Sequence, residues 1–158
     1  MEDVKDVFIS PLPDSPYVKP FRLNYTQNGK RKNWDLLEVH DSVAVVVFNI
    51  TRRKVIFVKQ FRPAVYYNCI KPEDRDKPID TKKYPGSIGL ALEMCAGIVD
   101  KDKNVNAIAQ EEILEECGYN VPLKSLEKIT SYRSGVGVQA ALQTFFYCEV
   151  TDDMKTTA

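Results

Sequence analysis

The chain has 158 residues, of which 44% are hydrophobic, and its 22 basic and 22 acidic residues give a formal net charge of zero. This length and composition are typical of one globular domain with a buried core. The balanced charge argues against nucleic acid or a membrane surface as a partner, because both favour a basic excess. The sequence contains neither a long apolar run nor a secretory signal, so we expect a cytoplasmic protein.

The cysteines do not form a metal-binding pattern. They are widely spaced and include no C-x-x-C pair, and His40 is the single histidine. A zinc site is therefore not expected. We interpret the four cysteines as buried free thiols of a reducing compartment.

A β-hairpin is predicted near the N-terminus. Residues 21–25 alternate apolar and polar side chains, and Asn28-Gly29 follows them. Asn-Gly between alternating segments is the strongest short signal for a hairpin. The returning strand is expected over residues 32–39 and carries Trp34, the only tryptophan.

Four prolines within residues 10–20 predict an extended, non-helical arm before this hairpin. We therefore divide the chain into two parts. Residues 1–41 form an N-terminal arm and hairpin, and residues 42–158 form the main domain.

The main domain opens with two predicted strands and a long loop. Residues 43–50 are almost continuously apolar, which indicates a strand covered on both faces. Residues 54–61 are expected to form the next strand, antiparallel to the first at the centre of a sheet. Residues 67–89 show no periodicity, and a loop of this length is usually functional or mobile.

Three further strands are expected over residues 90–95, 126–132 and 143–150. Strands this apolar need cover on both faces of the sheet, yet the sequence shows only one convincing helix. Either a second helix is missing at the C-terminus of a truncated chain, or a partner subunit or the loop of residues 67–89 covers that face.

The convincing helix covers residues 105–117. Asn104 or Asn106 can cap its start, and Gly118 can end it as a left-handed glycine. Apolar residues recur at helical spacing along it, which predicts one buried face.

This helix carries three carboxylates near its end, Glu112, Glu115 and Glu116. Glu112 and Glu116 are four residues apart and share a face, where like charges repel. A divalent cation offsets that repulsion, and Mg²⁺ is usually held by a few carboxylates together with a bound phosphate. A solvated acidic face is the simpler interpretation of the same pattern.

Residues 97–119 resemble the Nudix box, G-x5-E-x7-R-E-U-x-E-E-x-G-U, in which U is a bulky apolar residue. Gly97, the three glutamates and Gly118 match it without insertion or deletion. Two positions differ, because Lys103 stands where the box has its first Glu and Glu111 stands where it has Arg. If these two side chains face each other, an ion pair survives with its charges exchanged.

Flanking segments resemble the Nudix branch that cleaves nucleoside diphosphate sugars. They include the E-x-x-A-G run that ends at Gly97, the segment around Arg62, and Ser134-Gly135-Val136-Gly137. The resemblance implies that the Ala96 carbonyl binds metal and that Arg62, Ser134 and Gly135 contact the substrate. The residue types alone also allow tight turns at the glycines and a surface salt bridge for Arg62.

The resemblance implies an α/β fold, a Nudix-type α/β/α sandwich with a mixed β-sheet and an N-terminal β-hairpin extension. It also implies a homodimer built by that hairpin, in which Trp34 stacks on the base of the substrate; burial of Trp34 in the core is the alternative. The implied reaction is Mg²⁺-dependent hydrolysis of UDP-glucose to UMP and glucose 1-phosphate, or of ADP-ribose to AMP and ribose 5-phosphate, with Mn²⁺ as the alternative metal. Glu112, Glu115, Glu116 and Ala96 are the implied metal ligands.

The other interpretation is a Nudix-fold module that binds a nucleotide sugar or a partner with weak or no turnover. Lys103 favours it, and so does the scarcity of acidic residues after the last predicted strand. Related enzymes often place a general base there, and Asp152 and Asp153 are the only acids that remain.

Overall fold

The computed structural model describes residues 3–12, 14–100 and 102–156. Contacts divide the chain into two compact units. We call residues 1–12 and 57–93 the insertion unit, and residues 13–56 and 94–158 the sheet unit. The predicted boundary between residues 41 and 42 is a separate division and stays a prediction.

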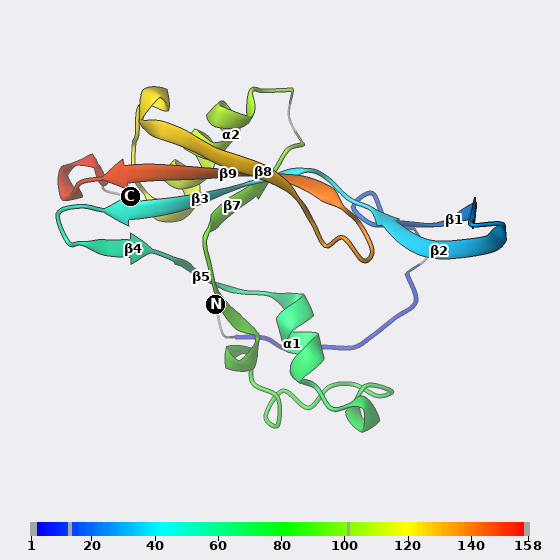
Figure 1. Cartoon of the computed structure of the whole chain (residues 1–158). Coiled ribbons are helices and arrows are strands. Elements are labelled where there is room, and N and C mark those ends of the chain that lie inside the picture. The colour runs from blue at the N-terminus through cyan, green and yellow to red at the C-terminus, as the bar shows by residue number, and fades with distance from the viewer. Residues whose placement is uncertain (1–2, 13, 101, 157–158) are drawn as a thin grey trace. The chain divides into compact units, whose positions relative to one another are not determined.

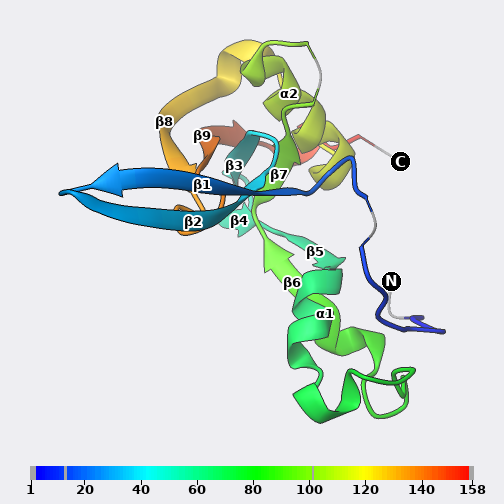
Figure 2. The same ribbon diagram turned by 90° about the vertical axis from the view of Figure 1, so that its right-hand side faces the viewer.

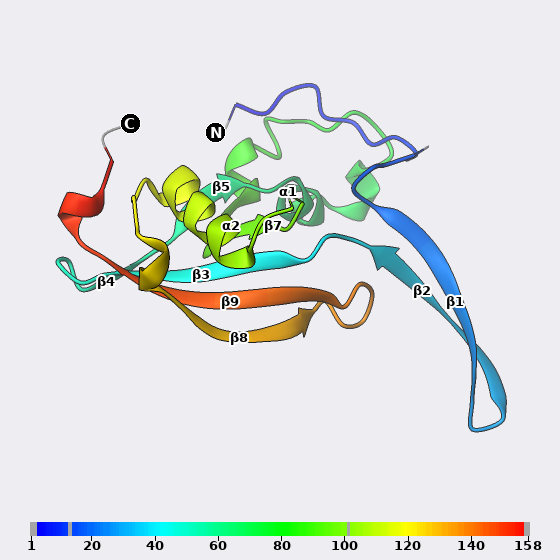
Figure 3. The ribbon, with the colours of Figure 1, turned by 90° about the horizontal axis from the view of Figure 1, so that it is seen from above.

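The predicted hairpin is confirmed in the sheet unit. Strand β1 (Lys19–Gln27) pairs antiparallel with β2 (Lys30–Glu38) along its whole length, so that Leu23 faces Trp34. Asn28 and Gly29 have φ angles of 53° and 72°, the left-handed pair that a two-residue hairpin turn requires. Figure 3 shows the hairpin as a ribbon that projects from the sheet.

The sheet unit contains a mixed five-stranded sheet, as expected (Figure 1). Its centre is the parallel pair of β3 (Ser42–Asn49) and β9 (Ala141–Val150). Strand β8 (Leu126–Ser134) lies antiparallel along the other side of β9. The free side of β3 is shared by two short strands, β4 (Lys54–Ile56) and β7 (Cys95–Ile98).

The prediction of a strand antiparallel to β3 is confirmed for Lys54–Ile56, but one central strand over residues 54–61 is wrong. Strand β4 ends at Ile56 and lies at the edge of the sheet, and β5 (Val58–Phe61) pairs with a different partner. The chain passes from the sheet unit to the insertion unit between Ile56 and Phe57. Because the apolar pattern continues across this point, the sequence alone did not show the break.

The predicted helix lies over one face of this sheet (Figure 3). Helix α2 (Val105–Glu112) continues into a π-helical turn, Ile113–Cys117, which ends at Gly118 with φ of 72°. Ile108 and Ile113 are fully buried, which anchors the helix on the core. Within the described residues of the sheet unit no helix covers the opposite face, so the second helix stays a prediction. None of the helices in the described ranges has the length and apolar character needed to cross a bilayer.

The insertion unit corrects the prediction of an aperiodic loop over residues 67–89. Helix α1 (Pro63–Cys69) precedes two 3₁₀ turns, Pro72–Asp74 and Gly86–Gly89, and β6 (Leu90–Glu93) then pairs with β5 (Figure 2). A small core holds these pieces together, formed by Tyr66, Ile70, Ile79 and Tyr84. The Tyr66 hydroxyl donates a hydrogen bond to the Tyr84 carbonyl at 2.7 Å, so its buried oxygen is satisfied.

The expected strand over residues 90–95 is also divided, because β6 ends at Glu93 and β7 begins at Cys95. The two pieces belong to different units. After β9 the described chain forms one more turn and one more backbone pairing. Asp152–Met154 forms a 3₁₀ turn, and Tyr119 pairs with Lys155 as an isolated bridge. Residues 157 and 158 lie outside the described residues.

Candidate metal and substrate site

The start of helix α2 is held by a side-chain cap and by an ion pair. The charges of this pair are reversed relative to the Nudix box. The Asn104 side chain accepts a hydrogen bond from the Asn106 N–H at 2.9 Å, so Asn104 is the cap. Lys103 Nζ lies 2.5 Å from Glu111 Oε1, and both side chains are partly exposed. The hypothesis that Lys103 and Glu111 face each other is therefore confirmed. The loop keeps an electrostatic link at the two positions where the sequence departs from the box.

Two of the three glutamates lie against strand β7. Glu116 Oε2 accepts a hydrogen bond from the Ala96 N–H at 3.0 Å. Glu112 lies so close to Gly97 that a Cβ atom at this position would overlap its carboxylate. Gly97 therefore leaves the space that the Glu112 side chain occupies. The helix and the strand bring together the carboxylates of Glu112 and Glu116 and the backbone of Ala96.

Glu115, the third glutamate, is exposed. Among the residues that the structure describes, no three His, Cys, Asp or Glu side chains form a group that could hold a metal ion. The two carboxylates that approach β7, those of Glu112 and Glu116, could supply hard oxygen donors. This set fits Mg²⁺, which commonly takes one or two carboxylates, keeps several waters and uses substrate phosphate as a further ligand.

Two thiols, those of Cys95 and Cys117, lie near these carboxylates. Cys95 is fully buried in β7, and Cys117 lies on the π turn. The hydrogen bond with Cys117 and burial raise the pKa of the Cys95 thiol, and the charges of Glu116 and Glu112 raise it further. The prediction of four buried thiols is wrong for Cys69, which is exposed.

Trp34 lies beside the predicted substrate loop. Its indole N–H donates a hydrogen bond to the Gly137 carbonyl at 2.7 Å, and the Leu37 N–H donates to Val138 at 2.9 Å. The side chain of Trp34 is 54% exposed, so core burial is not its role in the described chain. Trp34 presents an aromatic surface close to the loop that follows β8.

That loop begins with Ser134 and Gly135. The Ser134 hydroxyl donates to the Ala141 carbonyl at 3.4 Å. Gly135 has φ of 58°, and its carbonyl accepts hydrogen bonds from Val138 and Gln139 at 2.9 and 3.0 Å. The loop is therefore a closed turn held by its own backbone, which fixes Trp34's partner Gly137 in place.

Arg62 belongs to the insertion unit and is paired there. Its Nε and Nη2 atoms each lie 2.7 Å from the carboxylate oxygens of Glu93, a two-pronged ion pair. Hydrogen bonding by Arg62 lowers the pKa of Glu93 below its ordinary value. Glu93 opens the E-x-x-A-G run but was not assigned a role from the sequence. The two residues are 31 apart, so no local pattern could have paired them.

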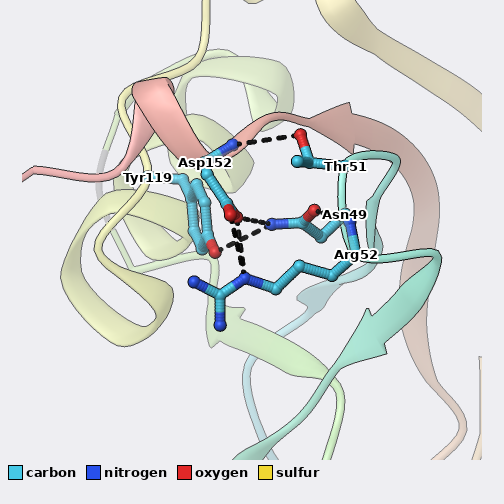
Figure 4. Close-up of polar contacts among 5 residues, drawn as sticks. All are labelled: Asn49, Thr51, Arg52, Tyr119 and Asp152. Atoms are coloured by element: carbon cyan, nitrogen blue, oxygen red, sulfur yellow. Dashed lines mark hydrogen bonds and ion pairs between the residues drawn. The ribbon is translucent and has the colours of Figure 1, made fainter.

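Asp152, one of the two acids considered as a general base, is held in a polar cluster (Figure 4). It accepts hydrogen bonds from Asn49 Nδ2 and Arg52 Nε, both at 2.8 Å. These two contacts lower the pKa of Asp152. A carboxylate stabilised in its charged form by two partners is poorly suited to accept a proton. Its neighbour Asp153 is exposed.

The chain matches curated proteins along nearly its whole length. No protein-family model matches the sequence. The chain is 40% identical to uridine diphosphate glucose pyrophosphatase NUDT14 of Bos taurus over 98% of its own length and 74% of that protein, and 41% identical over the same shares to the protein of that name in Mus musculus. It is 27% identical to a GDP-mannose pyrophosphatase of Citrobacter koseri over 85% of the chain and 64% of that protein. At this level of identity along nearly its whole length, the chain belongs to the Nudix hydrolase family.

Proposed function

We propose that this protein hydrolyses the diphosphate bond of nucleoside diphosphate sugars, with UDP-glucose as the first candidate substrate and ADP-ribose as the second. The relatives that match the chain along nearly its whole length are named as UDP-glucose pyrophosphatases. Membership in the Nudix hydrolase family implies a divalent metal. We propose Mg²⁺ as that metal, with Mn²⁺ as a substitute.

The observation that carries the proposal is the pair of carboxylates held against Ala96 and Gly97. The Ala96 N–H fixes Glu116, and the missing side chain of Gly97 gives Glu112 its place. With the Ala96 carbonyl they form the proposed metal site, and Glu115 is proposed as an outer ligand that reaches it through solvent. A bound divalent cation supplies positive charge that neutralises the diphosphate and activates a water molecule.

The remaining proposed residues orient the substrate. Trp34 offers an exposed ring for stacking on the base, and the loop of Ser134 and Gly135 supports it through Gly137. Arg62 is proposed to bind phosphate oxygens, for which its planar fork is suited. Arg62 is paired with Glu93. To bind phosphate, Arg62 has to leave Glu93 or contact both groups at once. Water adds to one phosphorus atom, the bridging P–O bond breaks, and UDP-glucose yields UMP and glucose 1-phosphate.

The first test is turnover of UDP-glucose and ADP-ribose with Mg²⁺, measured as UMP or AMP by chromatography. We expect Glu116→Gln to lower kcat/KM at least about 100-fold, because it removes a ligand charge while keeping volume, and loss of a mere supporting partner of a ligand already costs 10- to 100-fold. Glu127→Gln, an exposed change on β8, serves as the matched control and should keep wild-type activity. Near-normal turnover by Glu116→Gln would show that the metal site is misplaced.

The second candidate function is binding of a nucleotide sugar without turnover. Lys103 favours this function, but its ion pair with Glu111 preserves the link between the loop and the helix. If UDP-glucose raises the Tm of the wild-type protein and no product forms with Mg²⁺ or Mn²⁺, the binding function replaces the enzymatic one.

We also propose a homodimer built by the hairpin. The apolar side chains of Phe21, Leu23 and Trp34 are about half exposed, and an isolated two-stranded hairpin is marginal in water. Sedimentation velocity should give twice the chain mass of 18.0 kDa. Leu23→Asp should shift the protein to monomer, and Leu123→Asp, exposed on a distant turn, should not. A wild-type monomer at all concentrations would contradict the proposal.

A further inference from the structure

The polar cluster in Figure 4 joins three distant parts of the sheet unit. Asn49 is 1% exposed at the end of β3, and its Nδ2 group donates to Asp152 Oδ1 at 2.8 Å and to the Tyr119 hydroxyl at 3.2 Å. Its Oδ1 atom accepts the Arg52 N–H at 2.8 Å. Arg52 closes the cluster through its ion pair with Asp152. The buried amide of Asn49 therefore has hydrogen-bond partners for both its nitrogen and its oxygen.

The segment that contains Asp152 also contacts the residues that follow the π turn of Ile113–Cys117. Asn120 N–H donates to the Met154 carbonyl at 3.0 Å, and Thr156 N–H donates to the Gly118 carbonyl at 2.8 Å. The Thr156 hydroxyl donates to that same carbonyl at 3.1 Å. These bonds form a short antiparallel ladder. Its first residue, Gly118, lies only two positions after the proposed ligand Glu116.

The turn that the ladder holds is the unusual part of the helix. A π turn has wider hydrogen-bonded rings than an α-helix and is seldom stable without support. Here the N–H of Gly118 bonds to both Ile113 and Leu114, and a return to α-helical winding would rotate Glu116 relative to Glu112. The position of Glu116 against Ala96 therefore depends on what fixes the turn's C-terminal end.

We propose that residues 151–156 act as a clasp, locked by Asp152, that holds the π turn and so positions Glu116 for metal binding. The inference rests on the proposed metal site. Asp152 is a positioning residue in it: it acts through Asn49 and Tyr119 on the chain that follows Gly118. This role accounts for an acidic residue after the last strand that is not free to act as a base.

The test compares Asp152→Ala with Asp153→Ala, which removes a neighbouring exposed carboxylate. Two quantities are measured on the full chain. Mn²⁺ affinity is measured without substrate by electron paramagnetic resonance of the free ion, and amide hydrogen exchange is measured over residues 113–120. Circular dichroism confirms that each variant is folded under the conditions used. Asp152→Asn, which keeps an oxygen acceptor for Asn49, is the conservative variant.

We expect Asp152→Ala to weaken Mn²⁺ binding by about tenfold, the low end of the cost of losing a supporting partner behind a ligand. It should also speed exchange over residues 113–120, and Asp152→Asn should recover part of both effects. Equal Mn²⁺ affinity and equal exchange in the two alanine variants would overturn the clasp. If the wild type binds no Mn²⁺, the proposed function fails, and the exchange comparison alone then decides whether the clasp holds the turn.

Discussion

At the scale of single residues, Gly97 and Gly118 lie at the two ends of the segment that carries Glu112 and Glu116. The two positions need glycine for different reasons. Gly97 is needed for space, because the carboxylate of Glu112 occupies the volume that a Cβ atom would take. Gly118 is needed for conformation, because its φ of 72° is unfavourable for residues with a side chain. A sequence motif records both only as glycine, and the structure separates them.

This difference predicts opposite effects of alanine. Gly97→Ala should displace the flexible Glu112 carboxylate and lower turnover about 10- to 100-fold, with little change in the free energy of unfolding. Gly118→Ala should instead cost about 1 kcal/mol of stability, because it forces a side chain into the left-handed region. Urea unfolding and kcat/KM, measured on both variants, check the pair. Equal stability of the two variants would contradict this assignment.

At the scale of elements, helix α2 joins the loop that follows β7 through Lys103 and Glu111. The pair reverses the charges that the Nudix box has at these positions, and the distance of 2.5 Å shows that the link is retained. Because both side chains are partly exposed, solvent screening limits what the pair contributes to stability. Its main effect is local, on the loop that follows Gly97.

Charge reversal tests this link. Lys103→Glu places two like charges together and should lower the free energy of unfolding by about 0.5 kcal/mol. Adding Glu111→Arg should restore the loss and reproduce the usual order of charges in the box. A double-mutant cycle by urea unfolding at low salt measures the coupling. Additive effects of the two changes would mean that the ion pair contributes nothing in solution.

How much the sequence predicts depends on whether a feature is local. Asn28-Gly29, the apolar run in β3 and Gly118 each carry their signal within a few residues, and the hairpin, the central strand and the helix end were predicted correctly. The break at Phe57 arises from a change of strand partner, which no local pattern records. The pairing of Arg52 with Asp152 spans 100 residues and was equally invisible.

At the scale of the whole molecule, each unit carries its own ion pairs. Asp74 in the insertion unit accepts contacts from Lys83 at 2.5 Å and from the Tyr84 hydroxyl at 2.8 Å, and these lower its pKa well below the ordinary range. The pKa values of Glu93 and Asp152 are lowered as well. A folded-state pKa below the unfolded value stabilises the fold above that unfolded value, about 4 for a carboxyl group.

We therefore expect stability to be steady from pH 7 to pH 5 and to fall as pH drops below about 4. Asp74→Asn should lower the urea midpoint at pH 7 and show a smaller further loss in acid, because its neutral amide no longer titrates. Asp76→Asn, exposed two residues away, is the control and should follow the wild type. Equal acid sensitivity of Asp74→Asn and the wild type would show that another group is responsible.

Strands β4 and β7 occupy the same side of β3, at Val47–Asn49 and at Ser42–Val45, with only Val46 between them. The chain therefore leaves the sheet and returns to it at nearly one point. The segment of residues 57–93, which carries Arg62, can therefore change in length without the loss of a backbone pairing of β3. A change confined to residues 57–93 would leave the pairing of β3 with β4, β7 and β9 in place.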